Sequence, residues 1–171
     1  MTTDLISIRV AGENDALQLA EIHETAWRLS YQGLLPHIAL EQSIARRGPG
    51  WWQKVLRTRP NTMVLELEGE LGGYSTIGRN RTPSLPFTGE ILELYMKPTY
   101  QGLGFGRRLF EASKQALYSR NLSDLIIWSL KDNHSACSFY KRMGGQIIAE
   151  QNECFGQTKF RKIAYGWKIT S

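Results

Sequence analysis

Three glycines at alternate positions, Gly102, Gly104 and Gly106, separate a strand-like run from a helical pattern. The run covers residues 90–96, and the amphipathic helical pattern covers residues 104–119. Glycine lets a backbone approach a ligand closely, and the first amides of a helix have no carbonyl partners within the helix. This arrangement therefore predicts a cradle for a phosphate group.

Two arginines, Arg107 and Arg108, stand at the start of that helix and can add charge-assisted hydrogen bonds to the same anion, which favours a pyrophosphate. A P-loop is excluded because neither Gly-Lys-Ser nor Gly-Lys-Thr occurs in the chain. A dinucleotide fingerprint needs glycine where Arg107 stands, and its acid should close the second strand, whereas Asp124 precedes that strand. A tight turn whose glycines only permit packing remains the structural alternative.

The spacing of apolar residues predicts an alternation of strands and helices along the whole chain. Strands are predicted over residues 5–10, 63–68, 71–77, 90–96, 125–130, 146–153 and 159–169. Helices are predicted over residues 16–29, 37–47, 51–57, 104–119 and 135–143. Meandering antiparallel strands come first and two βα units follow. The predicted fold class is α/β, with a mixed, mostly antiparallel central sheet of about seven strands flanked by helices.

Length and composition agree with one domain, because 171 residues lie within the ~100 to 200 typical of a domain. Two cysteines, Cys137 and Cys154, are present, and no paired Cys/His ligands occur, so we expect no metal. The amino terminus lacks the features of a leader, and no apolar run approaches roughly 18 residues. We therefore expect a cytoplasmic protein without a membrane partner.

The net charge is +5, from 21 Lys and Arg against 16 Asp and Glu. This surplus suits an anionic ligand or a nucleic acid. The arginine pairs are spread along the chain, whereas a nucleic-acid-binding arm usually has one dense basic block. We therefore expect no nucleic-acid partner.

The glycine turn also satisfies the pattern Gln/Arg-x-x-Gly-x-Gly/Ala through Gln101, Gly104 and Gly106. Before it, residues 94–100 read Leu-Tyr-Met-Lys-Pro-Thr-Tyr. On these features, residues 90–145 resemble the GNAT superfamily of acyl-CoA-dependent N-acetyltransferases.

The later spacing from Asn133 to Tyr140 and then Gly144 belongs to the same resemblance. Residues 27–36 are similar to the first-helix segment of many small bacterial members, so we expect one GNAT domain from end to end. Gly145 departs from the family, which usually has Phe there. We expect this departure to change packing slightly without affecting the cradle.

The resemblance implies that acetyl-CoA is the acyl donor. The residues it assigns to this co-substrate are Leu94, Tyr95, Met96, Gln101, Gly102, Leu103, Gly104, Phe105, Gly106, Arg107 and Asn133. Backbone groups of the strand would hold the pantetheine arm and the thioester carbonyl, the turn amides would hold the pyrophosphate, and Asn133 would lie at the pantetheine. The resemblance assigns to Tyr140 the proton that the departing thiolate takes up. A phenol with a pKa of ~10 can protonate a thiolate whose thiol has a pKa of ~8.5, and a core position for this ring is the alternative.

Two glutamates of the strand over residues 90–96 are candidate bases for the amine. Glu90 and Glu93 lie on opposite faces because strand side chains alternate. An acid on an apolar strand is costly unless it is solvated or paired, so at least one should face a cleft. Glu90 matches a catalytic glutamate of some family members and comes first, Glu93 second, and proton loss through water is an equal alternative. Other members have an acid where Trp128 stands, so that option is excluded.

The remaining chemically active side chains show no catalytic pattern. We expect His23, His37 and His134 at the surface or in helix caps, because their spacing suggests neither a metal site nor a triad. Cys137 has no identifiable base and is expected to be a small buried hydrophobe.

Aromatic residues of the first helix, Trp27 and Tyr31, lie one turn apart and could wall an acceptor pocket together with Trp51 and Trp52, or fill the core. Core filling is favoured for Trp27. The sequence thus predicts an N-acetyltransferase that moves an acetyl group from acetyl-CoA to a primary amine of a small molecule or peptide, by direct attack in a ternary complex. The alternatives are transfer of a longer acyl group and acyl-CoA sensing without turnover. A homodimer is one possible oligomeric state.

Overall fold

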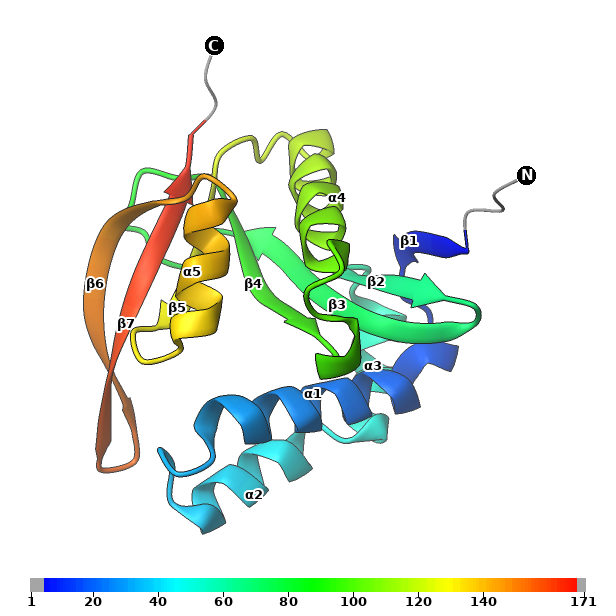
Figure 1. Ribbon diagram of the computed structural model, residues 1–171, viewed down its shortest axis with the longest axis horizontal. Helices are drawn as coiled ribbons and strands as arrows, with labels where there is room; N and C mark the ends of the chain where they lie inside the picture. Colours follow the sequence, from blue (N-terminus) through cyan, green and yellow to red (C-terminus); the bar gives the residue numbers. More distant parts are fainter. Residues whose placement is uncertain (1–4, 169–171) are drawn as a thin grey trace. The chain divides into compact units, whose positions relative to one another are not determined.

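The computed structural model describes residues 5–168, within which seven strands form one sheet (Figure 1). The strands are β1 (Ile6–Val10), β2 (Thr62–Leu67), β3 (Glu70–Arg79), β4 (Gly89–Met96), β5 (Leu125–Leu130), β6 (Gln146–Phe155) and β7 (Thr158–Trp167). Their order is β1-β2-β3-β4-β5-β7-β6. The pairs β1–β2, β2–β3, β5–β7 and β7–β6 are antiparallel, whereas β4 and β5 are parallel. The predicted α/β fold with a mixed, mostly antiparallel sheet is confirmed.

The helices also follow the predicted pattern. They are α1 (Ala16–Tyr31), α2 (His37–Arg46), α3 (Pro49–Thr58), α4 (Phe105–Ser119) and α5 (His134–Arg142). Their ends lie within two residues of the predicted ranges, as do those of the strands, except that the predicted end of the last strand at Ile169 lies outside the described residues. Among residues 5–168, no helix has both the length and the apolar character needed to cross a membrane.

Local chemistry explains where helices begin and end. Helix α3 starts two residues earlier than predicted because Pro49 occupies the first helical turn, where its missing N–H is not needed. Helix α5 is capped by Asn133, whose side-chain oxygen accepts a hydrogen bond from the Ala136 amide at 3.1 Å. Gly144, with φ +91°, follows the helix in a left-handed conformation that favours glycine.

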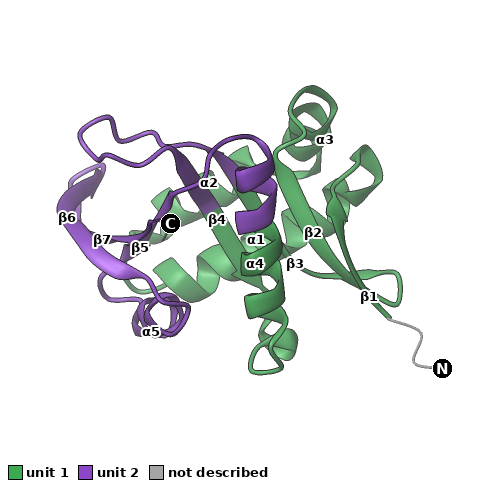
Figure 2. Cartoon of the chain, turned by 90° about the horizontal axis from the view of Figure 1, so that it is seen from above, with its two compact units in different colours: residues 1–76, 93–113 green, residues 77–92, 114–171 purple. Residues whose placement is uncertain are grey.

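The chain divides into two compact units, each built from two segments of sequence (Figure 2). Unit 1 comprises residues 1–76 and 93–113, and unit 2 comprises residues 77–92 and 114–171. Strand β4 and helix α4 therefore each contribute residues to both units. The second part of β4, the glycine turn and the start of α4 belong to unit 1.

Unit 1 has a core in which α1 and α3 contact the strands. Ala16, Leu19 and Ile22, three residues apart, place one apolar face of α1 in this core. Trp52 and Tyr74 join them, both almost completely buried, with ring centroids 5.2 Å apart. Burying such large side chains stabilises the unit by roughly 1.5–3 kcal/mol each.

Unit 2 is centred on the antiparallel pair of β5 and β7, to which the long β6 strand adds (Figure 1). Helix α5 lies against β5: Cys137 is buried, as predicted, with its sulfur 3.5 Å from the Leu130 carbonyl oxygen. Tyr140 of the same helix packs on Tyr165 of β7, with ring centroids 5.7 Å apart.

Candidate active site

The glycine turn joins β4 to α4 and has the backbone geometry of a cradle. Gly102 and Gly104 have φ +80° and +82°, conformations that side chains disfavour. A Cβ atom at either position would have no heavy atom within 4 Å, so both backbones face open space. The Arg108 amide donates to the Gly104 carbonyl at 3.3 Å to begin the helical bonding, and the amides of the first turn before it have no such backbone partner in the described part of the chain. These residues can accommodate the phosphates of a nucleotide-like ligand.

Side-chain and backbone contacts fix this turn to the end of β4. The Gln101 side-chain amide donates to the Met96 carbonyl at 3.1 Å, which brings two predicted co-substrate residues together. The Lys97 amide donates to the Gly72 carbonyl of β3 at 2.8 Å. Arg107 and Arg108 are exposed at the start of α4, where their guanidinium groups are accessible to an anion.

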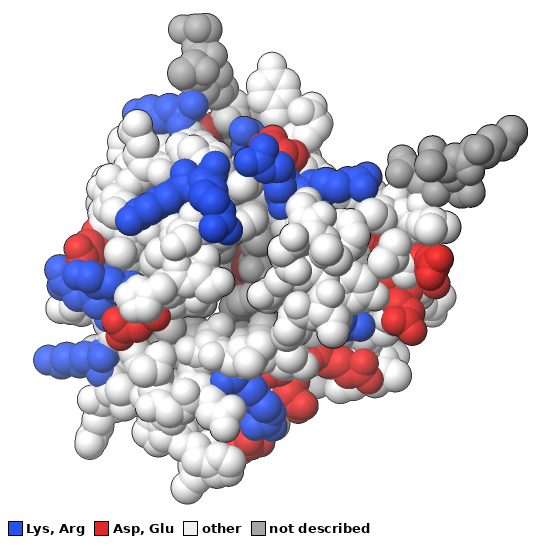
Figure 3. All heavy atoms as spheres, in the orientation of Figure 1, with Lys and Arg blue, Asp and Glu red and all other residues white. Residues whose placement is uncertain are grey.

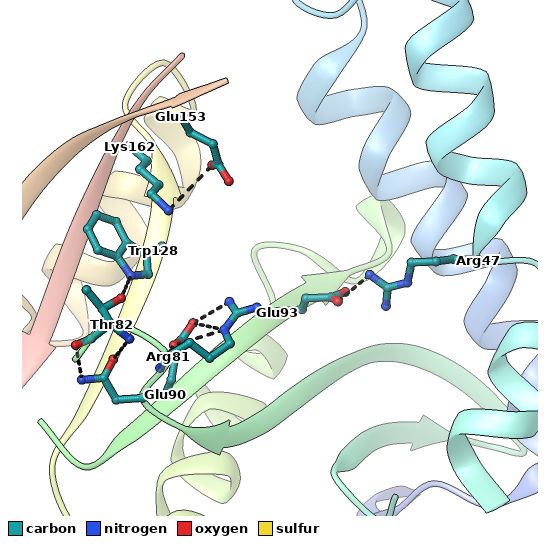
Figure 4. A network of polar contacts seen from close by, with 9 residues as sticks. Arg47, Arg81, Thr82, Glu90, Glu93, Trp128, Glu153 and Lys162 are labelled. Carbon is teal, nitrogen blue, oxygen red and sulfur yellow. Dashed lines mark hydrogen bonds and ion pairs between the residues drawn. The ribbon is translucent and has the colours of Figure 1, made fainter. Parts of the chain in front are cut away.

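Glu93 of β4 lies in a hydrogen-bonded cluster within unit 1. One carboxylate oxygen accepts from Arg47 Nη1 at 2.6 Å (Figure 4), and the other accepts from the Tyr74 hydroxyl at 2.5 Å. Burial, together with the Glu93 charge, raises the pKa of Tyr74 well above its usual value, so this hydroxyl stays protonated. The Glu93 side chain remains 17% exposed.

Arg47 immediately follows α2 and is held by aromatic rings as well as by Glu93. Its guanidinium carbon lies 4.4 Å from the Trp51 ring centroid and 5.0 Å from that of Trp52. Trp52 is buried, whereas Trp51 is 39% exposed. This arrangement could not be inferred from the sequence, because Arg47 and Glu93 lie 46 positions apart.

His23 was predicted at the surface or in a cap, and the structure shows that this prediction is wrong. The side chain is completely buried on α1, with its ring centroid 5.3 Å from Trp27 and 6.4 Å from Trp52. Burial, and then the positive charge of Arg47, lower its pKa to about 3, so the imidazole is neutral at pH 7. Neither ring nitrogen has a hydrogen-bond partner among the described residues. His37 and His134 are exposed, as predicted.

The candidate acceptor residues Trp27 and Tyr31 are half-buried, with ring centroids 4.5 Å apart. Their side chains are thus partly accessible rather than enclosed in the core. From Trp27, ring contacts continue through His23, Trp52 and Tyr74 to Tyr95 of β4. The candidate acceptor residues and one of the strand residues assigned to the co-substrate therefore belong to one aromatic row of unit 1.

Glu90 lies in unit 2 and is bound to the loop that precedes β4. Its carboxylate accepts from the Arg81 backbone amide at 3.0 Å and from Arg81 Nη2 at 2.7 Å (Figure 4). The side chain is only 1% exposed. In the same loop, the Asn80 side-chain amide donates to three carbonyl groups. Glu90 therefore anchors a loop, whatever else it does.

Tyr140 and Asn133 also belong to unit 2. Tyr140 is buried, and burial, followed by its neighbours Cys137 and Tyr165, raises its pKa above the usual value for a phenol. Asn133 is half-buried, and its side-chain oxygen caps α5.

Trp128 and Gly145, the two departures from the family pattern, have visible packing roles in unit 2. Trp128 donates its indole N–H to Thr82 at 3.2 Å, and Lys162 lies over its ring at 4.5 Å. A Cβ atom at Gly145 would lie 2.6 Å from a ring carbon of Trp167, so this indole occupies the space next to the glycine.

Within residues 5–168, no group of three or more His, Cys, Asp or Glu side chains could hold a metal ion.

Comparison with known proteins shows the family. Residues 16–145 match the model of the acetyltransferase (GNAT) family, and the chain belongs to this family. The predicted resemblance is thereby confirmed. An uncharacterized N-acetyltransferase, YuaI, of Bacillus subtilis (strain 168) is 23% identical over 164 residues, which cover 95% of this chain and 93% of that protein.

A spermidine N(1)-acetyltransferase of Thermoplasma acidophilum is 22% identical over 144 residues, covering 83% of this chain and 89% of that protein. Among solved structures, the PaiA N-acetyltransferase of Thermoplasma acidophilum in complex with coenzyme A has a similar fold, with a TM-score of 0.72. It is 18% identical, and the match covers 95% of this chain and 99% of that chain.

Proposed function

We propose that this protein is an acetyl-CoA-dependent N-acetyltransferase that acetylates a primary amine of a small molecule or peptide. The observation that carries the proposal is the turn at Gly102 and Gly104, whose open backbone precedes the first turn of α4. The presence of coenzyme A in a structure of similar fold supports it. The relative named as a spermidine acetyltransferase supports a small amine as acceptor.

The co-substrate would be held mainly by backbone groups. The amides of residues 102–107 would bind the pyrophosphate, and the backbone of Leu94, Tyr95 and Met96 would bind the pantetheine arm and polarise the thioester carbonyl. Gln101 would stiffen the turn, since it already bonds to Met96. By family resemblance, Asn133 would lie at the pantetheine.

The reaction would be a direct attack in a ternary complex. The amine nitrogen forms a bond to the thioester carbonyl carbon, the carbon–sulfur bond breaks, and the thiolate takes a proton from the Tyr140 hydroxyl. Burial raises the pKa of Tyr140, which keeps the hydroxyl protonated until the thiolate forms and also makes this phenol a weaker acid. The amine loses its proton through water. Of the two candidate carboxylates, Glu93 is the more exposed, at 17% against 1% for Glu90, and both of its oxygens already accept hydrogen bonds, so the water carries the proton to solvent.

We further propose that the protein is a single domain, lies in the cytoplasm, acts on a small acceptor and has no nucleic-acid partner. On the face drawn in Figure 3, Lys and Arg side chains lie in separate groups with Asp and Glu among them. Such a distribution favours a small ligand over a nucleic acid.

The test is a screen of polyamines, amino acids, aminoglycosides and peptides with acetyl-CoA, following release of the free thiol. Turnover with at least one amine, and an increased melting temperature in acetyl-CoA alone, are expected. A ligand at ~100 times its Kd stabilises a protein by ~2.7 kcal/mol. No thermal shift with millimolar acetyl-CoA in a folded sample would exclude the proposal, and a shift without turnover would favour the sensor.

A further inference from the structure

Arg47 occupies a cage whose chemistry suits a cation. We call Trp51, Trp52 and Glu93 the Arg47 cage. The centroids of the two indole rings lie 4.4 and 5.0 Å from the Arg47 guanidinium carbon, and a Glu93 carboxylate oxygen lies 2.6 Å from Arg47 Nη1. Aromatic faces combined with a carboxylate bind alkylammonium and guanidinium ions in general. Trp51 is 39% exposed and Glu93 is 17% exposed, whereas Trp52 is buried, so the cage is accessible on its Trp51 side.

A completely buried histidine adjoins the cage. His23 lies 6.4 Å from Trp52, measured between ring centroids, and neither of its nitrogens has a hydrogen-bond partner among the described residues. Because the imidazole is neutral, His23 adds no competing positive charge beside the cage.

The bonding of Arg47 in the cage is incomplete. Its Nε is buried without an acceptor among the described residues, although a buried N–H normally has one. A cation whose N–H groups all found acceptors in the cage could therefore displace the Arg47 guanidinium at a moderate cost in free energy.

A second position for the Arg47 side chain lies close by. Arg47 lines an open depression of about 240 Å³ together with two acids of α1, Glu21 and Glu24. Within residues 5–168, the one ion pair of Glu24 is a long one, 3.8 Å to Arg28. These two carboxylates can receive the guanidinium when it leaves Glu93.

We propose that the Arg47 cage binds a cationic group of the acceptor, and that Arg47 then moves from Glu93 to Glu21 and Glu24. This inference rests on the proposed function. Because the attacking amine must be neutral, the cation in the cage is a second group of the same molecule. The acceptor class is therefore an alkylamine that carries a further ammonium or guanidinium group.

The test measures binding of 1,4-diaminobutane to the full chain without acetyl-CoA, by isothermal titration calorimetry. Arg47→Met removes the resident charge and keeps an unbranched side chain against the indole rings. It should raise the affinity at least about tenfold, or produce binding where the original chain shows none, because a competing cation is gone. Adding Glu93→Gln should cancel the gain. Arg57→Met, at an arginine paired with Glu13 outside the cage and the depression, is the matched control and should change nothing.

The movement of Arg47 is tested by a double-mutant cycle. Replacing Glu21 and Glu24 by Gln should weaken diamine binding clearly in the original chain and much less in the Arg47→Met background. Equal effects in both backgrounds would overturn the exchange.

Unchanged or lower affinity for the diamine in folded Arg47→Met and Arg47→Ala would overturn the proposal that the cage binds a cation.

If neither variant folds, the test uses the original chain. Millimolar diamine should alter its tryptophan emission, and Trp51→Phe should remove that change. An unaltered emission would overturn the proposal. The melting-temperature shift with acetyl-CoA, measured on the same samples, separates the two proposals. Loss of this shift counts against the proposed function. If the shift is retained, a negative diamine result counts against the cage alone.

Discussion

Gly73 of β3 lies so close to Tyr95 of β4 that a Cβ atom on the glycine would be 2.6 Å from the Tyr95 carbonyl oxygen. Backbone atoms cannot give way as a flexible side chain can. The close approach explains a glycine in the middle of a strand, where this residue otherwise weakens pairing. It also fixes the strand that carries Glu93 and the residues assigned to the thioester.

Gly73→Ala should therefore destabilise the protein by about 1–3 kcal/mol, the usual cost of overpacking. Urea unfolding measures the change. Gly50→Ala is the matched control, since Gly50 lies in α3 with nothing within 4 Å of its Cβ position, and alanine there should be neutral or stabilising by up to ~1 kcal/mol. Equal stability of the Gly73 variant and the original chain would contradict the packing argument.

Gly104→Val should abolish binding of acetyl-CoA, because the side chain would fill the open space over the turn and strain a backbone at φ +82°. The readout is the melting-temperature shift with ligand. Gly33→Val introduces the same strain at φ +82° in the α1–α2 connection, also in open space, so it should lower stability but keep the ligand shift. If both variants kept the shift, the cradle would lie elsewhere.

Tyr140→Phe should preserve acetyl-CoA binding and lower kcat by ~100 to 10,000-fold, since it removes only the hydroxyl proposed to protonate the thiolate. Steady-state kinetics with an identified acceptor measures kcat and KM separately. Tyr165→Phe is the control, because it removes the hydroxyl of the neighbouring ring, whose centroid lies 5.7 Å from that of Tyr140. An unaltered kcat under conditions where chemistry limits the rate would return Tyr140 to a purely structural role.

The buried neutral His23 predicts a loss of stability in mild acid. Its pKa is about 3 in the folded protein and ~6.5 in the unfolded chain, so between these values only the unfolded chain takes up the proton. Proton uptake by the unfolded state lowers the free energy of unfolding as the pH falls below about 6.5, with a slope approaching ~1.4 kcal/mol per pH unit.

Urea unfolding from pH 7 to pH 4.5 measures that slope, which His23→Gln should reduce. Carboxylates of lowered pKa, such as Asp15, contribute equally to both proteins and cancel in the comparison. His37→Gln, at an exposed histidine, should leave the slope as it is. Identical slopes in all three proteins would contradict the buried neutral state.

The hydrogen-bonded cluster around Glu93 could not be predicted from the sequence, although each of its residues is visible there. Strand alternation predicted that Glu90 and Glu93 lie on opposite faces of an apolar strand, where an acid must be solvated or paired. It could not identify those partners, because Arg47 lies 46 positions from Glu93 and Tyr74 lies 19 positions from it. The same holds for His23, whose burial depends on Trp52 of another helix.

What the sequence determined by itself was the local structure: the helices and strands to within two residues, the mixed sheet, and the glycine turn ahead of α4. Apolar periodicity, helix caps and glycine conformations depend on residues close together in the sequence, so they can be recognised from the sequence alone. Only the tertiary structure decided which charges pair, which histidine is buried and which cation occupies the aromatic cage. Those outcomes depend on side chains that distant elements bring together, and no local pattern encodes which pairs will meet.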